Sequence, residues 1–167
     1  MSRSLGAKLT PALVQRLSQE DLPARLGLAV PLITTDGAGR PHPMLCSYLE
    51  LLAVDERTIR VVIAAGSRSA RNLTERGAAT LLLIEAGLVV YLKCRATGPP
   101  LELGALARFE MVVEDVIEDI ATGWEADAGI TTGIAYAPVP ALDAPEARAV
   151  LSALRAPDAP PRAPQSG

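Results

Sequence analysis

The octapeptide GSRSARNL, which begins at Gly66, has residue types suited to binding an anion, and it follows an apolar, β-branched run. Gly66 permits a tight turn, and Ser67 and Ser69 can cap a helix or donate hydrogen bonds. The first N–H groups of a helix carry partial positive charge, and the guanidinium groups of Arg68 and Arg71 suit phosphate oxygens. The run therefore predicts either a phosphate site or an ordinary serine-capped turn with solvated arginines.

Other reactive side chains are few. His42 is the only histidine, and it lies between two prolines at the start of an expected strand, with no Gly-x-Ser-x-Gly turn nearby. A catalytic triad is therefore disfavoured, and a structural or exposed histidine is the simpler interpretation. Cys46 and Cys94 lie in apolar runs without Cys-x-x-Cys or Cys/His spacing, which argues against zinc and favours buried free thiols in a reducing compartment.

A group of acidic residues stands late in the chain with a spacing that is irregular for a strand. We expect a solvated acidic face there rather than paired catalytic acids or a cation site, and so no metal. These carboxylates are Glu114, Asp115, Glu118 and Asp119.

Composition narrows the classes of protein. The 167 residues suffice for one domain, and hydrophobic residues make up 49% but aromatic residues only 3%, so the core must be mainly aliphatic. A net charge of −3 argues against a nucleic-acid-binding protein. No Walker loop, Rossmann fingerprint, signal peptide or membrane-spanning run is recognisable, so we expect a cytoplasmic protein without membrane contact.

The apolar patterns and turn residues predict a mainly β protein with flanking helices. Strands in direct succession favour a six-stranded antiparallel β-barrel over a parallel α/β sheet. We expect strands at 27–35, 41–54, 58–65, 79–84, 88–96 and 106–116, and helices at 1–26, 70–76 and 143–155.

The domain organisation follows from these elements. We expect a single domain over 1–155, in which the barrel occupies about 27–120 between an N-terminal helix (1–26) and a C-terminal helix (143–155). The Pro/Ala/Ser-rich tail 156–167 should be disordered. Several strands are apolar on both faces and need a second cover, which indicates a homodimer.

The order and spacing of four segments resemble the pyridoxamine 5′-phosphate oxidase-like family, the FMN-binding split barrels, over about 25–120. The serine-arginine segment is the most specific of the four. They are TTDGAGRPHP (34–43), VDERTIR (54–60), SRSARNL (67–73) and VVYLKCRA (89–96).

The resemblance implies a split barrel of the FMN-binding type, in a homodimer with cofactor sites at the subunit interface. It implies that Ser67, Arg68 and Ser69 hold the FMN phosphate and that Arg60, Val61 and Val62 run along the flavin ring. Asn72 matches a supporting position that bonds backbone near the phosphate loop. Lys93 matches a basic position, but Cys94 follows it where the family commonly has glycine.

The expected function is therefore that of a flavin-dependent oxidoreductase with a small-molecule redox partner and unassigned catalytic residues. True pyridoxamine phosphate oxidation is not expected, because the family's arginine- and histidine-rich C-terminal motif is missing and no histidine follows His42. The alternatives are a flavin-binding sensor without turnover, a deazaflavin protein, and a haem-binding split barrel with His42 as axial ligand.

Overall fold

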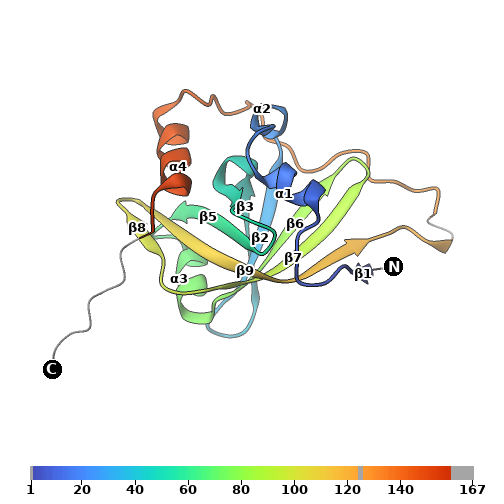
Figure 1. The fold of residues 1–167 in the computed structure, drawn as a ribbon, viewed down its shortest axis with the longest axis horizontal. Helices are drawn as coiled ribbons and strands as arrows, with labels where there is room; N and C mark the ends of the chain where they lie inside the picture. Colours follow the sequence, from blue (N-terminus) through green and yellow to red (C-terminus); the bar gives the residue numbers. More distant parts are fainter. Residues whose placement is uncertain (1, 124–125, 159–167) are drawn as a thin grey trace.

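The computed structural model describes residues 2–123 and 126–158 (Figure 1). Within them, five short helices flank one antiparallel sheet. The helices are α1 (Pro11–Leu17), α2 (Leu22–Arg25), the 3-10 turn η1 (Tyr48–Glu50), α3 (Arg68–Arg76) and α4 (Pro145–Arg155). The strands are β1 (Ser2–Ser4), β2 (Ala29–Thr35), β3 (Pro41–Ser47), β4 (Leu51–Ala53), β5 (Thr58–Ala64), β6 (Ala78–Glu85), β7 (Leu88–Ala96), β8 (Leu101–Leu103) and β9 (Leu106–Asp119).

The sheet curls into a barrel whose two edge strands are consecutive in the chain. The strand order is β3-β2-β6-β7-β9-β5-β4, and β1 and β8 also pair with β9. The edges β3 and β4 are joined by η1 alone, where Ser47 and Glu50 bond each other reciprocally in a capping box. The expected strand 41–54 is therefore wrong as a single element, since η1 turns it from one edge of the sheet to the other.

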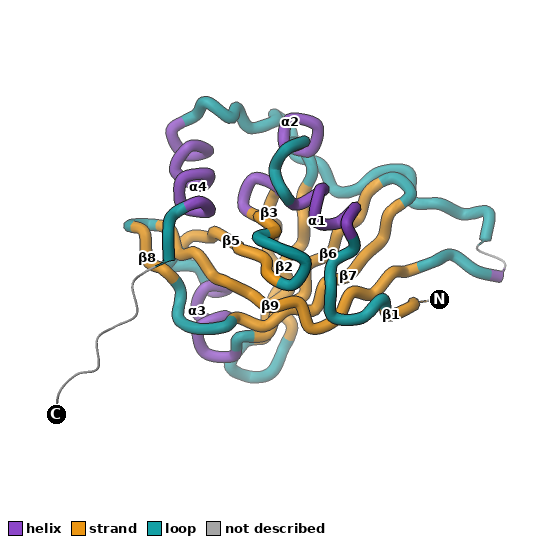
Figure 2. Tube along the Cα trace, in the orientation of Figure 1, coloured by secondary structure: helices purple, strands orange, loops and turns teal. Residues whose placement is uncertain are grey.

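Alternate residues along each strand fill the barrel, as period-2 packing requires. The enclosed side chains include Leu32 on β2, Val61 on β5, Leu81 on β6, Leu92 on β7 and Phe109 on β9. Most of this core is aliphatic, as the composition predicts. The fold class is therefore confirmed, although the described residues form nine strands instead of six. The additional strands are short β1 and β8, together with the division of 41–54 (Figure 2).

The helix expected over 1–26 is wrong. Residues 2–4 form β1, and two short helices follow. Thr10 caps α1, and Gln19 has a positive φ of 70°, which ends helical backbone before α2. The side-chain amide of Gln19 donates to the carbonyls of Leu49 and Leu51, so this break in the helix is fixed against the barrel.

The helices cover different parts of the barrel. In Figure 1, α1, α2 and α4 lie on one side and α3 lies on the other. Buried Ala70 and Leu73 of α3 belong to the main core, whereas Ala153 and Leu154 of α4 pack on Val62, on the outer face of β5. The expected helices at 70–76 and 143–155 match α3 and α4, which begin at Arg68 and Pro145.

The segment between β9 and α4 runs beside the tip of the β6–β7 hairpin. The N–H of Gly87 donates to the carbonyl of Ile130, and Leu28 pairs with Ala135. Trp124 and most of the expected disordered tail, 159–167, lie outside the described residues. No helix in the described ranges is long and apolar enough to cross a membrane.

Candidate functional site

The first turn of α3 follows β5 directly and is fixed by a serine cap. The hydroxyl of Ser67 accepts a hydrogen bond from the N–H of Ala70 at 3.1 Å. At the other end, Gly77 terminates the helix in the left-handed conformation with φ of 71°. Gly66 has no positive φ, and a Cβ there would meet nothing within 4 Å, so this turn does not depend on glycine.

Ser69 is the second residue of α3 and is buried, with 1% of its surface exposed. Its Oγ makes no hydrogen bond within the described part of the chain. A buried hydroxyl without a partner costs free energy, and such groups are rare in folded proteins. Ser69 is therefore the member of this turn with an unsatisfied need for a polar partner.

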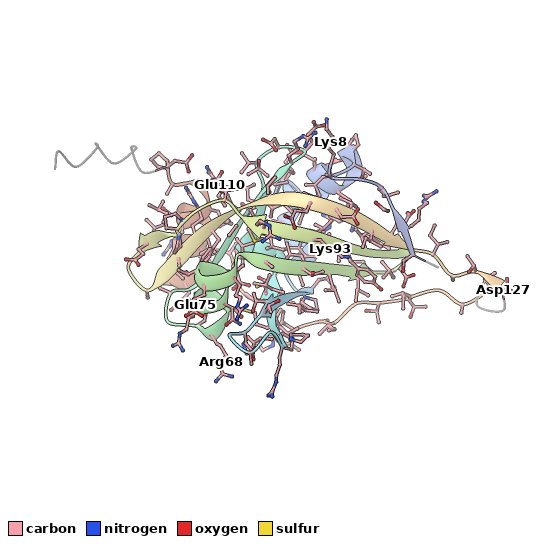
Figure 3. All side chains as sticks on the ribbon, turned by 90° about the horizontal axis from the view of Figure 1, so that it is seen from below. Lys8, Arg68, Glu75, Lys93, Glu110 and Asp127 are labelled. Atoms are coloured by element: carbon pink, nitrogen blue, oxygen red, sulfur yellow. The ribbon has the colours of Figure 1, made fainter. Side chains whose placement is uncertain are left out.

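Two arginines flank this serine and are free to bind a ligand. Arg68 and Arg71 are exposed, and neither side chain has an ion-pair or hydrogen-bond partner among the described residues. In Figure 3, Arg68 extends from α3 away from the barrel. Both guanidinium groups therefore retain all their donors for an anion at this end of the molecule.

Asn72 fixes α3 to the barrel. It is buried, and its side-chain N–H donates to the hydroxyl of Thr34 on β2 at 2.9 Å, while that hydroxyl donates to the carbonyl of His42 at 3.3 Å. The sequence predicts a bond from Asn72 to backbone near the loop, whereas the observed partner is a side chain on a neighbouring strand. The asparagine thus connects α3 with the wall of an adjacent groove.

This groove, of about 310 Å³, crosses β2, β6 and β7. Lys93 of β7 lies in it and is exposed, opposite Thr80 on β6 and Asp115 on β9. Figure 3 shows Lys93 over the middle of the sheet. Thr34 also lines the groove, so the Asn72–Thr34 hydrogen bond links α3 to the groove wall, although no residue of α3 itself lines the groove. The groove lining comprises Ile33, Thr34, Thr35, Pro41, Ala78, Ala79, Thr80, Lys93, Cys94 and Glu114.

A bulge beside Lys93 accounts for the adjacent acidic residues Glu114 and Asp115. The β7–β9 register shifts between Lys93 and Cys94, so that Glu114 has no opposite residue. Glu114 pairs with Arg95 at 2.6 Å, and Asp115 accepts from Ser4 of β1 at 2.6 Å. Within the described residues no three metal-ligating side chains come together.

The three predicted ring contacts on β5 lie away from this region. Val61 is enclosed in the barrel core, and Val62 is covered by α4. Arg60 points to the same outer face as Val62, where it donates to the carbonyl of Leu154 at 3.2 Å and pairs with Asp158 at 3.0 Å. A contact between these side chains and a flavin ring stays a prediction.

Sequence reasoning missed Arg108, the most buried charged residue of the described chain, with 3% exposure. It lies on β9 opposite Val62 and beside Arg60, and it too pairs with Asp158. The signal was available, since period-2 alternation along 106–112 gives Arg108 and Glu110 the same face.

The remaining reactive groups are structural. His42 is half-buried on β3, with its carbonyl in the Asn72–Thr34 chain. Cys46 and Cys94 are buried free thiols, as expected. Burial raises the pKa of Cys94 to about 12, with a smaller contribution from the charge of Glu114, so this thiol is not poised as a nucleophile.

Comparison with solved structures identifies the fold. No protein-family model and no protein of curated function matches the sequence. Solved structures do match. A candidate pyridoxamine 5′-phosphate oxidase from Lactobacillus delbrueckii has a TM-score of 0.53 and 15% identity, over 68% of this chain and 98% of that chain. An FMN-binding protein from Syntrophomonas wolfei has a TM-score of 0.53 and 11% identity, over 67% and 89%.

A third match is the HupZ protein of Group A Streptococcus, with a TM-score of 0.52 and 12% identity over 66% of this chain and 99% of that chain. Identities this low establish the fold and nothing finer. The chain therefore has the split β-barrel fold of the pyridoxamine 5′-phosphate oxidase-like proteins, as its ordered motifs predicted.

Proposed function

We propose that the chain binds a flavin-type cofactor, FMN in the first place, with its phosphate at the start of α3. The observation that carries this proposal is the buried Oγ of Ser69, which lacks a partner in the described structure. The adjoining helix N-terminus and the side chains of Arg68 and Arg71, which have no ion-pair partner in the part of the chain that the structure describes, supply the positive charge that a phosphate requires. These residues fit a phosphate group, and they would fit the phosphate of a deazaflavin equally well.

The groove that contains Lys93 is the proposed location for the rest of the cofactor. The hydrogen bond between Asn72 of α3 and Thr34 of the groove wall supports this location, because it fixes the position of α3 relative to the groove. When bound, a flavin supplies the hydride or electron transfer. The roles of this chain are then to hold the phosphate through Ser69 and Arg68 and to present the cationic Lys93 along the groove.

We propose further that the protein works as a flavin-dependent oxidoreductase on a small molecule and as a homodimer. This sequence lacks the C-terminal histidine and arginine motif of true pyridoxamine phosphate oxidases, so a different substrate is proposed. Purified protein loaded with FMN should turn over NADH or NADPH with oxygen or another acceptor. Stable FMN binding with no turnover under these conditions would favour a sensing protein instead.

The first experiment is the visible absorption spectrum of purified protein before and after excess FMN and desalting. Retained flavin bands are expected. A Soret band that disappears in His42→Ala would instead indicate a haem cofactor with His42 as its axial ligand. Protein that stays colourless after FMN would remove the cofactor proposal and leave the fold unchanged.

Two substitutions test the phosphate turn. Ser69→Ala should weaken FMN binding while leaving the unfolding free energy equal or higher, because it removes an unsatisfied buried hydroxyl. Arg68→Ala should weaken FMN binding at least tenfold, since a charge-assisted hydrogen bond contributes about 1.5–3 kcal/mol. Fluorescence titration measures both affinities.

Arg57→Ala is the matched control, because Arg57 is an exposed arginine at the opposite end of β5. Its FMN affinity should equal that of the wild type. If Ser69→Ala and Arg68→Ala both bind FMN within twofold of the wild type, the phosphate lies elsewhere.

A further inference from the structure

A second cluster of positive charge lies on the opposite side of the barrel from α3, beneath the end of α4. Arg60 of β5 and Arg108 of β9 share the outer face of the sheet, where Arg60 is opposite Glu110 and Val62 is opposite Arg108. Their side chains are only 13% and 3% exposed. Two guanidinium groups buried side by side repel each other unless an anion lies between them.

The two arginines donate hydrogen bonds both to backbone carbonyls of α4 and to a carboxylate. The Nη1 atom of Arg60 donates to the carbonyl of Leu154, and the Nη1 atom of Arg108 donates to the carbonyls of Ala153 and Ala156. These bonds satisfy the last carbonyls of α4, which is a structural role.

The Nη2 atoms of both arginines donate to the Asp158 carboxylate instead of to α4. The Nη2 atom of Arg60, at 3.0 Å, and the Nη2 atom of Arg108 both donate to Oδ1 of Asp158. Glu110 stands further away, at 3.5 Å from Arg60 and 3.9 Å from Arg108. One carboxylate oxygen thus occupies the point on which two buried guanidinium groups converge.

We propose that Arg60 and Arg108 form an anion site for a phosphate group, and that Asp158 occupies it as an internal competitor. Asp158 lies beyond the end of α4, and its side chain is 64% exposed, so the carboxylate can leave without opening the barrel core. A phosphate oxygen can accept the same two Nη2 bonds, and phosphate carries more negative charge than the Asp158 carboxylate that it would replace beside Glu110.

This site is distinct from the phosphate turn at α3. Arg60 precedes the end of β5 by four residues, which is about 13 Å of strand. The proposal therefore does not depend on flavin binding, and inorganic phosphate is a sufficient probe.

The test is calorimetric titration of inorganic phosphate at constant ionic strength. Asp158→Asn keeps the size of the side chain and removes its charge, and it should bind phosphate roughly tenfold more tightly than the wild type. Asp127→Asn is the control, because Asp127 is an exposed aspartate at the far end of the molecule (Figure 3). Its phosphate affinity should not change.

A second substitution in the Asp158→Asn background assigns the gain to the arginines. Arg60→Gln should abolish it. Because Arg60 also caps α4, Arg60→Lys serves as a milder variant that keeps the charge, loses the guanidinium fork and should reduce the gain. Equal phosphate affinity in wild type and Asp158→Asn would overturn the proposal, and so would a gain that survives both Arg60 substitutions.

The source of the phosphate follows from a parallel titration with FMN and riboflavin. A gain for FMN but not riboflavin in Asp158→Asn identifies the phosphate of a flavin, and a gain for inorganic phosphate alone identifies the free anion. Ser69→Ala should leave either gain unchanged, so failure of the α3 proposal is distinguishable from failure of this one.

Discussion

The two cysteines are residues whose burial has a measurable consequence at alkaline pH. Burial raises the pKa of both thiols above the ordinary value of 9.0, assisted by the charge of Glu50 near Cys46 and of Glu114 near Cys94. A raised folded-state pKa gives stability that is complete below pH 9 and is lost as the pH rises, because only the unfolded chain then releases the protons.

We therefore expect the free energy of unfolding to fall as the pH rises from 9 toward about 12 in reducing buffer. Each thiol contributes a slope of up to about 1.4 kcal/mol per pH unit. Urea titrations at several pH values measure this slope, and Cys94→Ala should flatten it regardless of its own effect on stability. An unchanged slope in the variant lacking both cysteines would assign the alkaline loss to other groups.

How far individual residues were predictable depends on whether their partners are local. Ser67 was recognisable as a cap because its partner, the N–H of Ala70, lies three residues away. Arg108 was not, because its partners come from α4 and Asp158, about fifty residues along the chain. Ser69 was predicted for its hydroxyl, but only the structure reveals that the hydroxyl has no hydrogen-bond partner in residues 2–123 and 126–158.

Among the elements, the segment from Ile130 to Tyr136 is held by close backbone packing that requires glycine at one position. A Cβ on Gly133 would stand 2.1 Å from the carbonyl oxygen of Ile84, whereas a Cβ on Gly129 would meet nothing within 4 Å. Neither glycine has a positive φ, so the two alanine substitutions differ in contact and not in backbone strain.

Gly133→Ala should detach this segment from the β6–β7 hairpin and lower stability by about 1–3 kcal/mol. Hydrogen exchange at the N–H of Gly87, which donates to Ile130, reports the detachment directly. Gly129→Ala should leave both readouts at wild-type values. Equal protection of Gly87 in the two variants would show that the contact does not hold the segment.

Helices and strands were predictable where the spacing of apolar residues and the residues of the flanking turn indicated the same boundary. Leu88–Ala96 was predicted to the residue because a tight glycine turn precedes an apolar run. The N-terminal helix failed because Leu9, Leu13, Leu17 and Leu22 are spaced like one helix face. In the structure these leucines belong to one hydrophobic core, but they come from a loop and from two separate helices. Their spacing therefore reflects burial in the same core and not one continuous helix.

The whole molecule has an outer sheet face that α4 leaves largely uncovered. Half-buried apolar side chains of β2, β6 and β7 lie on it, beside Leu45, which is 48% exposed. A partner subunit is the cover that a sheet apolar on both faces needs. The side chains of this face are Ile33, Leu82, Ile84, Val89 and Tyr91.

Light scattering should give twice the chain mass of 17.5 kDa. Leu82→Glu should yield monomers and weaken FMN retention, because a charge on this face opposes burial against a second copy. Val54→Glu places the same charge on an exposed apolar residue away from the face and should remain dimeric. A monomeric wild type would refute the dimer.

The position of β9 in the sheet also sets an order of events for the chain leaving the ribosome. β9 pairs with β1, β5, β7 and β8, and it separates β7 from β5 in the strand order. Until residues 106–119 are available, the sheet is two fragments, β3-β2-β6-β7 and β5-β4, which are joined only by the chain through η1 and through α3. Roughly two thirds of the chain is therefore synthesised while apolar strand edges are still unpaired. Nascent chains stopped before β9 should depend on chaperones, whereas chains stopped after β9 should not.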